Sequence, residues 1–503
     1  MTMSHFRKLV DMQEGTKFPS FTYKKVILEP AYDGAKENFV DYMMQINIAH
    51  LMMLEEQGLV TQLEAQKIGK AIAEIDKEFY KTSTYDDYYE DLFFRIENEL
   101  IKKAGDIGGN LHIARSRNDM GIAIYRMTIR KKLLTMMERL LTFQSALHLL
   151  ANEHLDTIMI GYTHTQQAQP TTFAHYIKGL MDKLERDTKR LRAAFETVNR
   201  SSMGAAALTT SGFSINRNRM CELLAFDDVI ENAWDSVAGA DYLMEVATAI
   251  QVASLNLGRS IQDFLTWGTQ EYDAIEIADP YVQVSSIMPQ KRNPVALEHS
   301  RALLSAIVGD TNTVLTMIHN TPFGDVNDTE DDLQPYLWRS IDKLTDIYEL
   351  LTAVFTTMKV NQAVLEKRAK ESFANVTELA DTLVRVEKLS FRQAHHLVSL
   401  CIQKISPNQK LSNFTYEILQ EEFMRFMKRP LELSQKQFEQ AICPRNFIQV
   451  RKIKGGPAPG TMKSSLNDFE VRFTKTRQWI QRKKKKIEKQ EGYLESYCEN
   501  WVE

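Results

Sequence analysis

Long stretches almost free of helix breakers constrain this chain more than any other feature of its sequence. Residues 121–157 contain no proline and a single glycine, Gly121, at their start. Apolar side chains recur there at separations of three, four and seven residues, which puts them on one stripe of a helix. Such a helix would span about 55 Å, longer than a small domain is wide. Similar stretches cover 173–200, 240–257, 296–320 and 337–359. We therefore predict an all-α protein with a long central helix bundle, because apolar stripes of this length need partner helices.

Turn-forming residues suggest where this bundle begins and ends. The segment GDIGGN at 105–110 precedes the first long stretch, and a smaller helical part begins near residue 369. We predict three helical domains: an N-terminal domain over 1–116, the long-helix bundle over 117–368, and a C-terminal domain over 369–503 with a basic extension. The lysine-rich run RKKKK at 482–486 is more typical of a solvated helix end or tail than of a nucleic-acid-binding segment.

Composition narrows the class of protein further. The net charge of −4 gives no global basic field for nucleic acid or a membrane surface. The N-terminus carries charges where a signal peptide needs an apolar stretch, and no apolar run is long enough for a bilayer. The four cysteines are scattered without CxxC spacing, which favours free thiols in a reducing cytoplasm over a zinc site. We expect a cytoplasmic protein with no nucleic-acid or membrane partner.

Three polar segments interrupt the helical pattern and contain the candidate site residues. They are HIARSRND at 112–119, GYTHTQQAQP at 161–170 and QVSSIMPQKRNPVALE at 283–298. Arginine offers a rigid fork for a carboxylate, and serine and asparagine add neutral donors, so the first and third segments suit a carboxylate-rich small molecule. An isolated RSRND is more often a surface turn, and an isolated histidine is more often structural. The joint occurrence of the three segments is what indicates a site.

These segments resemble the three signature regions of the fumarase, aspartase and argininosuccinate lyase superfamily. The loop SSIMPQKRNP resembles the catalytic loop of that superfamily, LHIARSRND resembles the LHxGRSRND segment of argininosuccinate lyases, and GYTHTQQAQP resembles their GYTHLQxAQP. INRNRM at 215–220, DSVAGAD at 235–241 and FANVTELADTLV at 373–384 add further matches. The resemblance covers about residues 40 to 460 and identifies the chain as a member of the argininosuccinate lyase family.

The resemblance implies a carbon–nitrogen lyase that releases fumarate from an N-substituted aspartate. Ser285 takes the position of the base that removes the Cβ proton, and His164 that of the group assisting protonation of the leaving amine. Glu298 corresponds to a glutamate that pairs with the histidine, often from another subunit. Lys291 would assist catalysis beside the dianionic intermediate. The residues expected to bind substrate or lie beside it are Arg115, Ser116, Asn118, Thr163, Asn293 and Arg217.

The same resemblance implies partners and cofactors. Relatives assemble as homotetramers whose active sites take residues from three chains, and they close the serine loop over substrate. No metal or organic cofactor is implied, and the histidine, cysteine and aspartate spacings show no ligand cluster. The expected partners are therefore the small-molecule substrate and other copies of the same chain.

One segment departs from the family pattern. Argininosuccinate lyases commonly read YNKDxQEDKE where residues 325–334 read DVNDTEDDLQ here, and Phe93 replaces the histidine of their EDIH segment. We expect Asp325 and Glu330 to lie at the amine end of the substrate, where two carboxylates favour a cation. The leading function is conversion of argininosuccinate to arginine and fumarate, in arginine biosynthesis. The alternatives are a paralogous lyase similar to ethylenediamine-disuccinate lyase, with a different amine, or a catalytically silent structural relative like the delta crystallins.

Overall fold

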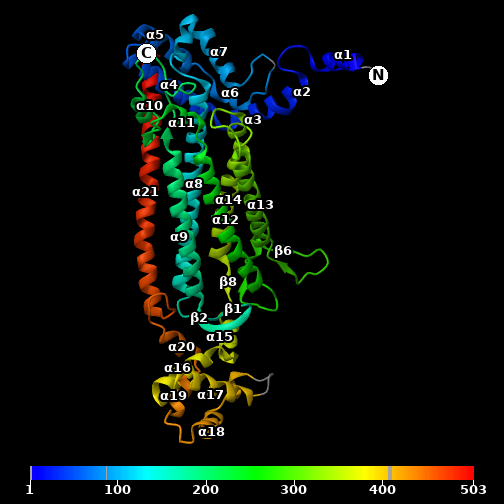
Figure 1. Cartoon of the computed structure of the whole chain (residues 1–503), viewed down its shortest axis with the longest axis vertical. Coiled ribbons are helices and arrows are strands. Elements are labelled where there is room, and N and C mark those ends of the chain that lie inside the picture. Colours follow the sequence, from blue (N-terminus) through cyan, green and yellow to red (C-terminus); the bar gives the residue numbers. More distant parts are fainter. Residues whose placement is uncertain (1–2, 87, 406–409, 503) are drawn as a thin grey trace.

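The computed structural model describes residues 3–86, 88–405 and 410–502, and most of them are helical. Long helices run side by side through the middle of an elongated molecule (Figure 1). The five predicted stretches become α8 (Arg117–Glu153), α9 (Phe173–Val198), α12 (Asp241–Trp267), α13 (Val295–Ile318) and α14 (Gln334–Thr357). The predicted all-α fold class with a long central bundle is confirmed.

Local chemistry explains where the longest helix begins. Ser116 is the N-cap of α8, and its hydroxyl accepts a hydrogen bond from the Asn118 N–H. The Asp119 carboxylate accepts one in return from the Ser116 N–H, which completes a capping box. Along α8 the stripe predicted from the sequence is buried, with Leu133 and Leu140 fully inaccessible in the bundle core.

The N-terminal helices form a second core at one end of the bundle (Figure 1). They are α1 (Met3–Glu14), α2 (Phe21–Tyr23), α3 (Glu29–Asn38), α4 (Val40–Glu56), α5 (Gln62–Ala73), α6 (Lys77–Thr82) and α7 (Leu92–Ala104), with a π-helical turn at Lys24–Leu28 and a 3₁₀ turn at Asp106–His112. Helix α4 contributes more of this core than any other element, whereas α1 and α2 contribute no buried residue. The start of α8 also contributes, so the first helices are fixed to the bundle by its own first turns.

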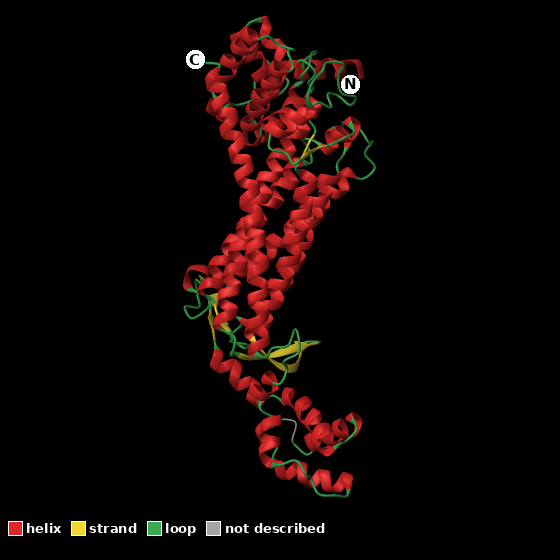
Figure 2. Cartoon of the chain, turned by 90° about the vertical axis from the view of Figure 1, so that its left-hand side faces the viewer, coloured by secondary structure: helices red, strands yellow, loops and turns green. Residues whose placement is uncertain are grey.

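A third core lies at the opposite end of the bundle (Figure 2). It is built by α16 (Val376–Glu387), α17 (Phe391–Gln403), α18 (Tyr416–Met427) and α19 (Gln435–Ala441), which follow α15 (Gln362–Glu371) and precede α20 (Pro444–Gln449). Further 3₁₀ turns occupy Asp279–Tyr281, Asn327–Thr329, Phe373–Asn375 and Leu411–Asn413.

The last helix, α21 (Pro459–Asn500), differs from the predicted basic extension of the C-terminal domain. It returns along the bundle to the N-terminal helices, burying Trp479 in the bundle core and Trp501 in the N-terminal core (Figure 1). The lysine run lies inside this helix rather than at a free end. Lys483 binds Asp227 at 2.6 Å and Lys484 binds Glu138 at 2.8 Å, so helix-to-bundle ion pairs use part of the run. The domain boundaries at 116 and 368 stay predictions.

Short strands, which the sequence did not predict, interrupt the helices. β1 (Ile158–Thr163) pairs antiparallel with β2 (Gln166–Thr172), and β6 (Gln283–Val284) pairs antiparallel with β7 (Arg292–Asn293). The remaining pairs are β3 (Arg200–Ser201) with β4 (Asp228–Val229), and β5 (Ile275–Glu276) with β8 (Lys359–Val360). Two short helices, α10 (Arg217–Leu223) and α11 (Ala233–Ala238), follow β3 and β4. The first two hairpins hold predicted site residues.

Within residues 3–86, 88–405 and 410–502, no helix is both long enough and apolar enough to cross a membrane.

Candidate active site

One group of predicted residues gathers at the start of α8, and we call Arg115, Ser116, Asn118, Asp325 and Glu330 the upper cluster. The Ser116 hydroxyl donates to Asn118 Oδ1 at 2.8 Å. Asn118 Nδ2 in turn donates to Asp325 Oδ2 at 2.5 Å. The loop between α13 and α14 thus brings Asp325 to the RSRND segment, although the two residues are 207 positions apart.

Glu330, in the upper cluster, has a strongly raised pKa. Burial and then a hydrogen bond with Asp325 raise the pKa of Glu330 to about 9. Glu330 therefore keeps its proton at neutral pH. Asp331 lies beside Glu330 and accepts a hydrogen bond from the Tyr125 hydroxyl at 2.7 Å, and burial raises its pKa. Substrate binding by Asp325 and Glu330 stays a prediction.

Contacts with buried residues hold the Arg115 side chain in place. Its side chain is 7% exposed, and Nη1 donates to Asn47 Oδ1 of α4 at 2.7 Å. Burial lowers the pKa of Arg115 to about 10, while the carboxylates of Asp119 and Glu97 oppose that shift. Its Cζ lies 6.0 Å from the centroid of the Phe93 ring, the residue that departs from the family pattern. An apolar ring here leaves the guanidinium less solvated than a histidine would.

The Arg217 guanidinium is bonded to other parts of the chain, unlike that of an arginine free to bind an anion. Its Nε donates to the Met203 carbonyl at 3.0 Å, and Nη2 donates to the Ile230 carbonyl at 2.9 Å and the Ser236 hydroxyl at 3.0 Å. These bonds fasten the chain segments around α10 and α11 together. The substrate-binding role expected for Arg217 stays a prediction, and its contacts are structural.

Asp119 was missed as a functional candidate. It is fully buried, and its Oδ2 accepts from the N–H groups of Gly204 at 2.9 Å and Ala206 at 3.0 Å. The other oxygen of Asp119, Oδ1, accepts from the Ser116 N–H. The Asp119 carboxylate therefore joins the RSRND turn to the turn at 204–206. The S-x-x-D spacing predicts the cap, but the second contact is long-range and has no local signal.

His164 and Thr165 form the two-residue turn between β1 and β2, and both have positive φ values, 50° and 62°. This is the backbone geometry of tight hairpin turns that glycine or asparagine usually occupies. Thr163, the last residue of β1, pairs with Gln166, and the side chains of Thr163 and His164 are exposed. A strained turn that presents a histidine at its tip indicates a functional constraint.

Ser285 begins the loop between β6 and β7. Its Oγ accepts hydrogen bonds from the main-chain N–H groups of Met288 at 3.1 Å and Ile287 at 3.3 Å. Two N–H donors aimed at one hydroxyl oxygen stabilise negative charge on it, which is what an alkoxide base needs. Asn293 Nδ2 donates to the Gln283 carbonyl at 3.0 Å across the hairpin. Lys291 is exposed near the end of the same loop.

Arg292 anchors this loop, which we call the serine loop (residues 285–291). Its guanidinium binds the Ile277 carbonyl at 2.8 Å and pairs with Asp279 and Glu276. Glu298 lies in the first turn of α13, as predicted, and its side chain is exposed. In the described part of a single chain no ion pair joins Glu298 to His164.

The upper cluster, the His164 hairpin and the serine loop do not meet within one chain. Helix α8 has 37 residues and is about 55 Å long, so it separates the upper cluster from the His164 hairpin at its other end. Helix α13 has 24 residues and puts about 36 Å between the serine loop and the segment containing Asp325. Figure 1 shows β1 and β2 at the opposite end of the bundle from the start of α14.

Comparisons with known proteins identify the family. Residues 35–309 match the lyase family model, and residues 373–449 match the model of the argininosuccinate lyase C-terminal region. Argininosuccinate lyase 2 of Agrobacterium fabrum is 38% identical over 90% of this chain and 90% of its own length. Argininosuccinate lyase of Methanocaldococcus jannaschii is 35% identical over 90% of this chain and 92% of its own.

Solved structures of lyases also resemble this chain. A crystal structure of EDDS lyase with formate has a TM-score of 0.85 at 28% identity, covering 98% of both chains. An EDDS lyase variant with bound fumarate has a TM-score of 0.84 over the same share of each chain. A class II fumarase of Schistosoma mansoni, at 15% identity and a TM-score of 0.66, shares the fold. The predicted family is confirmed: the chain is a lyase and belongs to the argininosuccinate lyase family.

Proposed function

We propose that this protein catalyses the elimination of fumarate from argininosuccinate, releasing arginine. The observation that carries the proposal is the setting of Ser285, whose oxygen receives two main-chain N–H donors in an exposed loop that also contains Lys291 and is followed by Asn293 in β7. The curated relatives that match nine tenths of the chain support the choice of substrate.

The difficult step is removal of a proton from a carbon beside a carboxylate that is already negative. The Ser285 alkoxide would take the Cβ proton, and the electron pair would move into the carboxylate to give a dianion. Lys291 and Asn293 supply a cation and a neutral donor near that charge. The C–N bond then breaks, the leaving nitrogen takes a proton with the help of His164, and fumarate remains. Glu298 would stabilise the charged form of the imidazole.

We further propose that the active site is completed by other copies of the chain in a homotetramer. The upper cluster, the hairpin and the serine loop lie on an elongated chain, separated by helices about 36–55 Å long. Chains that associate side by side in opposite directions would bring the hairpin of one to the upper cluster of another. Each group has exposed side chains available for such a contact.

Fumarate release, followed by ultraviolet absorbance, tests the activity with argininosuccinate beside a panel of N-substituted aspartates. Turnover of argininosuccinate is expected. Ser285→Ala should abolish elimination while leaving substrate binding intact, and Ser286→Ala is the matched control in the same loop. If Ser285→Ala keeps its activity, the assigned base is wrong.

Mixing two inactive variants tests the shared site. Ser285→Ala and His164→Asn homotetramers should each be inactive, and a tetramer reassembled from both should regain part of the activity. That recovery requires sites in which Ser285 and His164 come from different chains. Absence of recovery, in mixed tetramers verified by mass spectrometry, would contradict shared sites.

A second candidate is elimination of a different amine, with argininosuccinate a poor substrate. It is favoured by the carboxylate pair of Asp325 and Glu330 beside Asn118, which suits a cationic leaving group. The likeness to EDDS lyase over 98% of the chain points the same way. In the substrate panel, turnover of another member without turnover of argininosuccinate would select this candidate. A folded tetramer with no turnover at all would instead favour a structural role.

We also propose that the enzyme acts in the cytoplasm, in arginine biosynthesis. Four cysteines are free, three of them buried, which fits a reducing compartment. Restored growth, without added arginine, of cells that lack their own argininosuccinate lyase would support this assignment. Growth with Ser285→Ala as well as with the unmodified chain would contradict it.

A further inference from the structure

A cavity of about 490 Å³ lies between the first third of α8, the end of α9, the short helix α11 and the start of α12. This volume is within the range of small-molecule sites. The residues predicted to take part in elimination all lie elsewhere. Two of the carboxylates in the cavity, Asp235 and Asp241, belong to the segment DSVAGAD, which the proposed reaction does not use.

Arg126 of α8 lines this cavity and has free hydrogen-bond donors. Its side chain is 2% exposed, and Nη1 donates to the main-chain carbonyls of Thr197 at 2.9 Å and Val198 at 3.3 Å. Nε is buried without a partner, and Nη2 also forms no hydrogen bond with the residues that the structure describes. Nε–H and Nη2–H form one edge of the guanidinium, the kind of donor pair that a carboxylate accepts in bidentate contact.

The charge of Arg126 is buried without a partner of opposite sign. Its Cζ lies 3.9 Å from the centroid of the Tyr242 ring, and burial lowers its pKa. Within the described part of the chain no carboxylate forms an ion pair with it. A buried cation in this state is unfavourable, and a carboxylate bound from the cavity would supply the missing charge.

The cavity also presents charges of both signs from different elements. Arg200 of β3 lies 3.9 Å from its acidic neighbour Asp228, so its guanidinium is only weakly paired. Asp235 belongs to α11, whereas Asp241 and Glu245 lie four residues apart on one face of α12. These three side chains are exposed, and none of them forms an ion pair with a described residue. One ligand with a carboxylate and separate cationic groups would match this arrangement.

We propose that this cavity binds a free amino acid with a cationic side chain. The ligand carboxylate would accept hydrogen bonds from Arg126 and Arg200, and its ammonium groups would contact the carboxylates of α11 and α12. A dicarboxylic acid fits less well, because its second carboxylate would meet those acidic side chains. A diamine would leave the free edge of Arg126 unused. The site is separate from that of elimination, so the proposal does not depend on the identity of the substrate.

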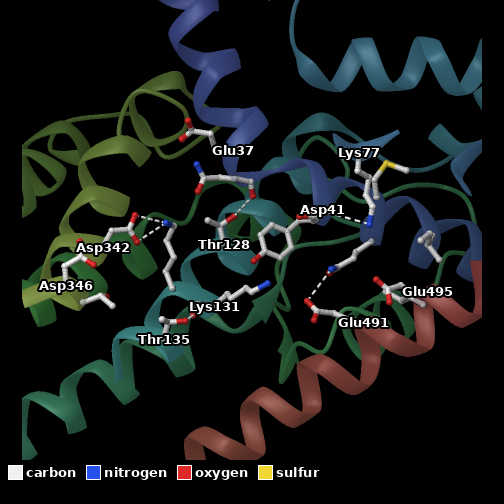
Figure 3. Close-up of a pocket in the computed structure, with 18 residues that line it drawn as sticks. Glu37, Asp41, Lys77, Thr128, Lys131, Thr135, Asp342, Asp346, Glu491 and Glu495 are labelled. Atoms are coloured by element: carbon white, nitrogen blue, oxygen red, sulfur yellow. Dashed lines mark hydrogen bonds and ion pairs between the residues drawn. The ribbon is translucent and has the colours of Figure 1, made fainter. Parts of the chain in front are cut away.

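A larger cavity, of about 650 Å³, provides a contrast (Figure 3). There Asp342 binds Lys132 at 2.7 Å, and Asp41 lies 3.8 Å from Lys77 and 3.0 Å from Lys81. Among the described residues that line this larger cavity, none has a buried side-chain nitrogen or oxygen without a partner. The indication of a ligand therefore belongs to the Arg126 cavity.

A bound amino acid would stabilise the folded chain. Arg126 already connects α8 to the end of α9, and the ligand would extend this connection to Asp235 of α11 and Glu245 of α12. Because the cavity exists only in the folded chain, binding is expected to raise the melting temperature, and the increase should grow with ligand concentration.

Calorimetric titration of the full-length protein with L-lysine tests the proposal. L-lysine is not a product of the proposed elimination, so its binding is a test separate from that of the active site. Saturable binding to one site per chain is expected. L-norleucine lacks the side-chain ammonium and cadaverine lacks the carboxylate. Each should bind at least about tenfold more weakly than L-lysine, the loss expected for one charge-assisted hydrogen bond.

Variants of the cavity locate the site. Arg200→Gln and Glu245→Gln should each weaken L-lysine binding by about tenfold. Glu231→Gln is the matched control, because Glu231 is exposed next to a cavity residue but does not line the cavity. Arg126→Lys keeps a positive charge but loses the paired donors, so it should also weaken binding. If Arg126→Lys does not fold, the Arg200 and Glu245 variants decide.

Three results would overturn the proposal. The first is titration with L-lysine that does not saturate. The second is binding of cadaverine or L-norleucine as tight as that of L-lysine, because the cavity would then not recognise both ends of the ligand. The third is equal affinity for L-lysine of the double variant Arg200→Gln/Glu245→Gln and of Glu231→Gln, when circular dichroism shows that both are folded.

Discussion

Replacing Gly69 with alanine is expected to detach the end of α21 from the N-terminal helices. Gly69 lies inside α5, and the six-membered and five-membered rings of Trp501 rest directly on it. A Cβ at position 69 would lie 2.3 Å from Trp501 Cδ2 and 2.4 Å from Cε3, far closer than side chains approach one another. Trp501 is 7% exposed and makes an edge contact with Tyr497, so its ring has no room to shift within this core.

Two opposing terms set the size of the effect. Alanine is favoured over glycine inside a helix by about 1 kcal/mol. Loss of a buried tryptophan costs about 3–5 kcal/mol, because its apolar area returns to water and a cavity remains. The expected net destabilisation of the contact is therefore about 2–4 kcal/mol. It should appear first as local opening of the last turns of α21, since that end can detach without unfolding the bundle.

Hydrogen exchange of residues 490–502, together with urea unfolding, measures this effect. Gly492→Ala is the matched control: it lies on α21, nothing lies within 4 Å of its added Cβ, and the same helix preference applies. Gly492→Ala should be neutral or stabilising by up to about 1 kcal/mol. In a Trp501→Ala background the penalty of Gly69→Ala should vanish, because the two side chains are coupled. Equal stability of Gly69→Ala and Gly492→Ala, or an unchanged penalty without Trp501, would refute the reasoning.

Three further predictions concern the candidate site. The folded chain keeps a proton on Glu330 between pH 4.5 and about 9 that the unfolded chain releases, so stability should fall by about 1.4 kcal/mol per pH unit over that window. Glu330→Gln should flatten this dependence in urea unfolding at pH 6 and pH 8, and identical slopes would contradict a proton retained on Glu330. Asp119→Ala should cost about 3 kcal/mol or more, because it removes the acceptor of three main-chain N–H groups, one of them buried and two partly buried. Asp119→Asn should cost less in the same measurement. Arg292→Ala should change the melting temperature little, because the ion pairs of Arg292 are exposed. It should lower kcat for fumarate release, because the serine loop would lose its anchor. An unchanged kcat would show that the loop needs no anchor.

The long helices were predictable because their signal is local. Scarcity of proline and glycine, together with the apolar stripe, gave α8, α9, α13 and α14 to within a few residues. The return of α21 along the bundle was not predictable in this way. Its lysine run looks solvated from the sequence, and the acceptors at Asp227 and Glu138 lie more than 250 positions away.

In the candidate site, too, the local features were predictable and the long-range contacts were not. Sequence motifs singled out Ser285, His164 and the RSRND segment as candidates, because polar residues between apolar helices stand out, and their roles stay predictions. The tight turn at His164 and Thr165 was not predicted, because such hairpin turns usually contain glycine or asparagine and this one contains neither. The contacts of Asp119 with Gly204 and of Arg115 with Asn47 were missed because they depend on the fold rather than on neighbouring residues.

The length of the helices and the location of the polar residues together impose a condition on catalysis. An alkoxide base is useful when a cation and a proton donor lie within about 3 Å of the reacting atoms. In one chain the residues that could supply these groups sit at the ends of helices tens of ångströms long, on turns that project outward. A shorter bundle could have enclosed such a site within a single chain. Here the same helices that separate the groups also provide long apolar surfaces, so the feature that divides the site in one chain is the one that would assemble it between chains.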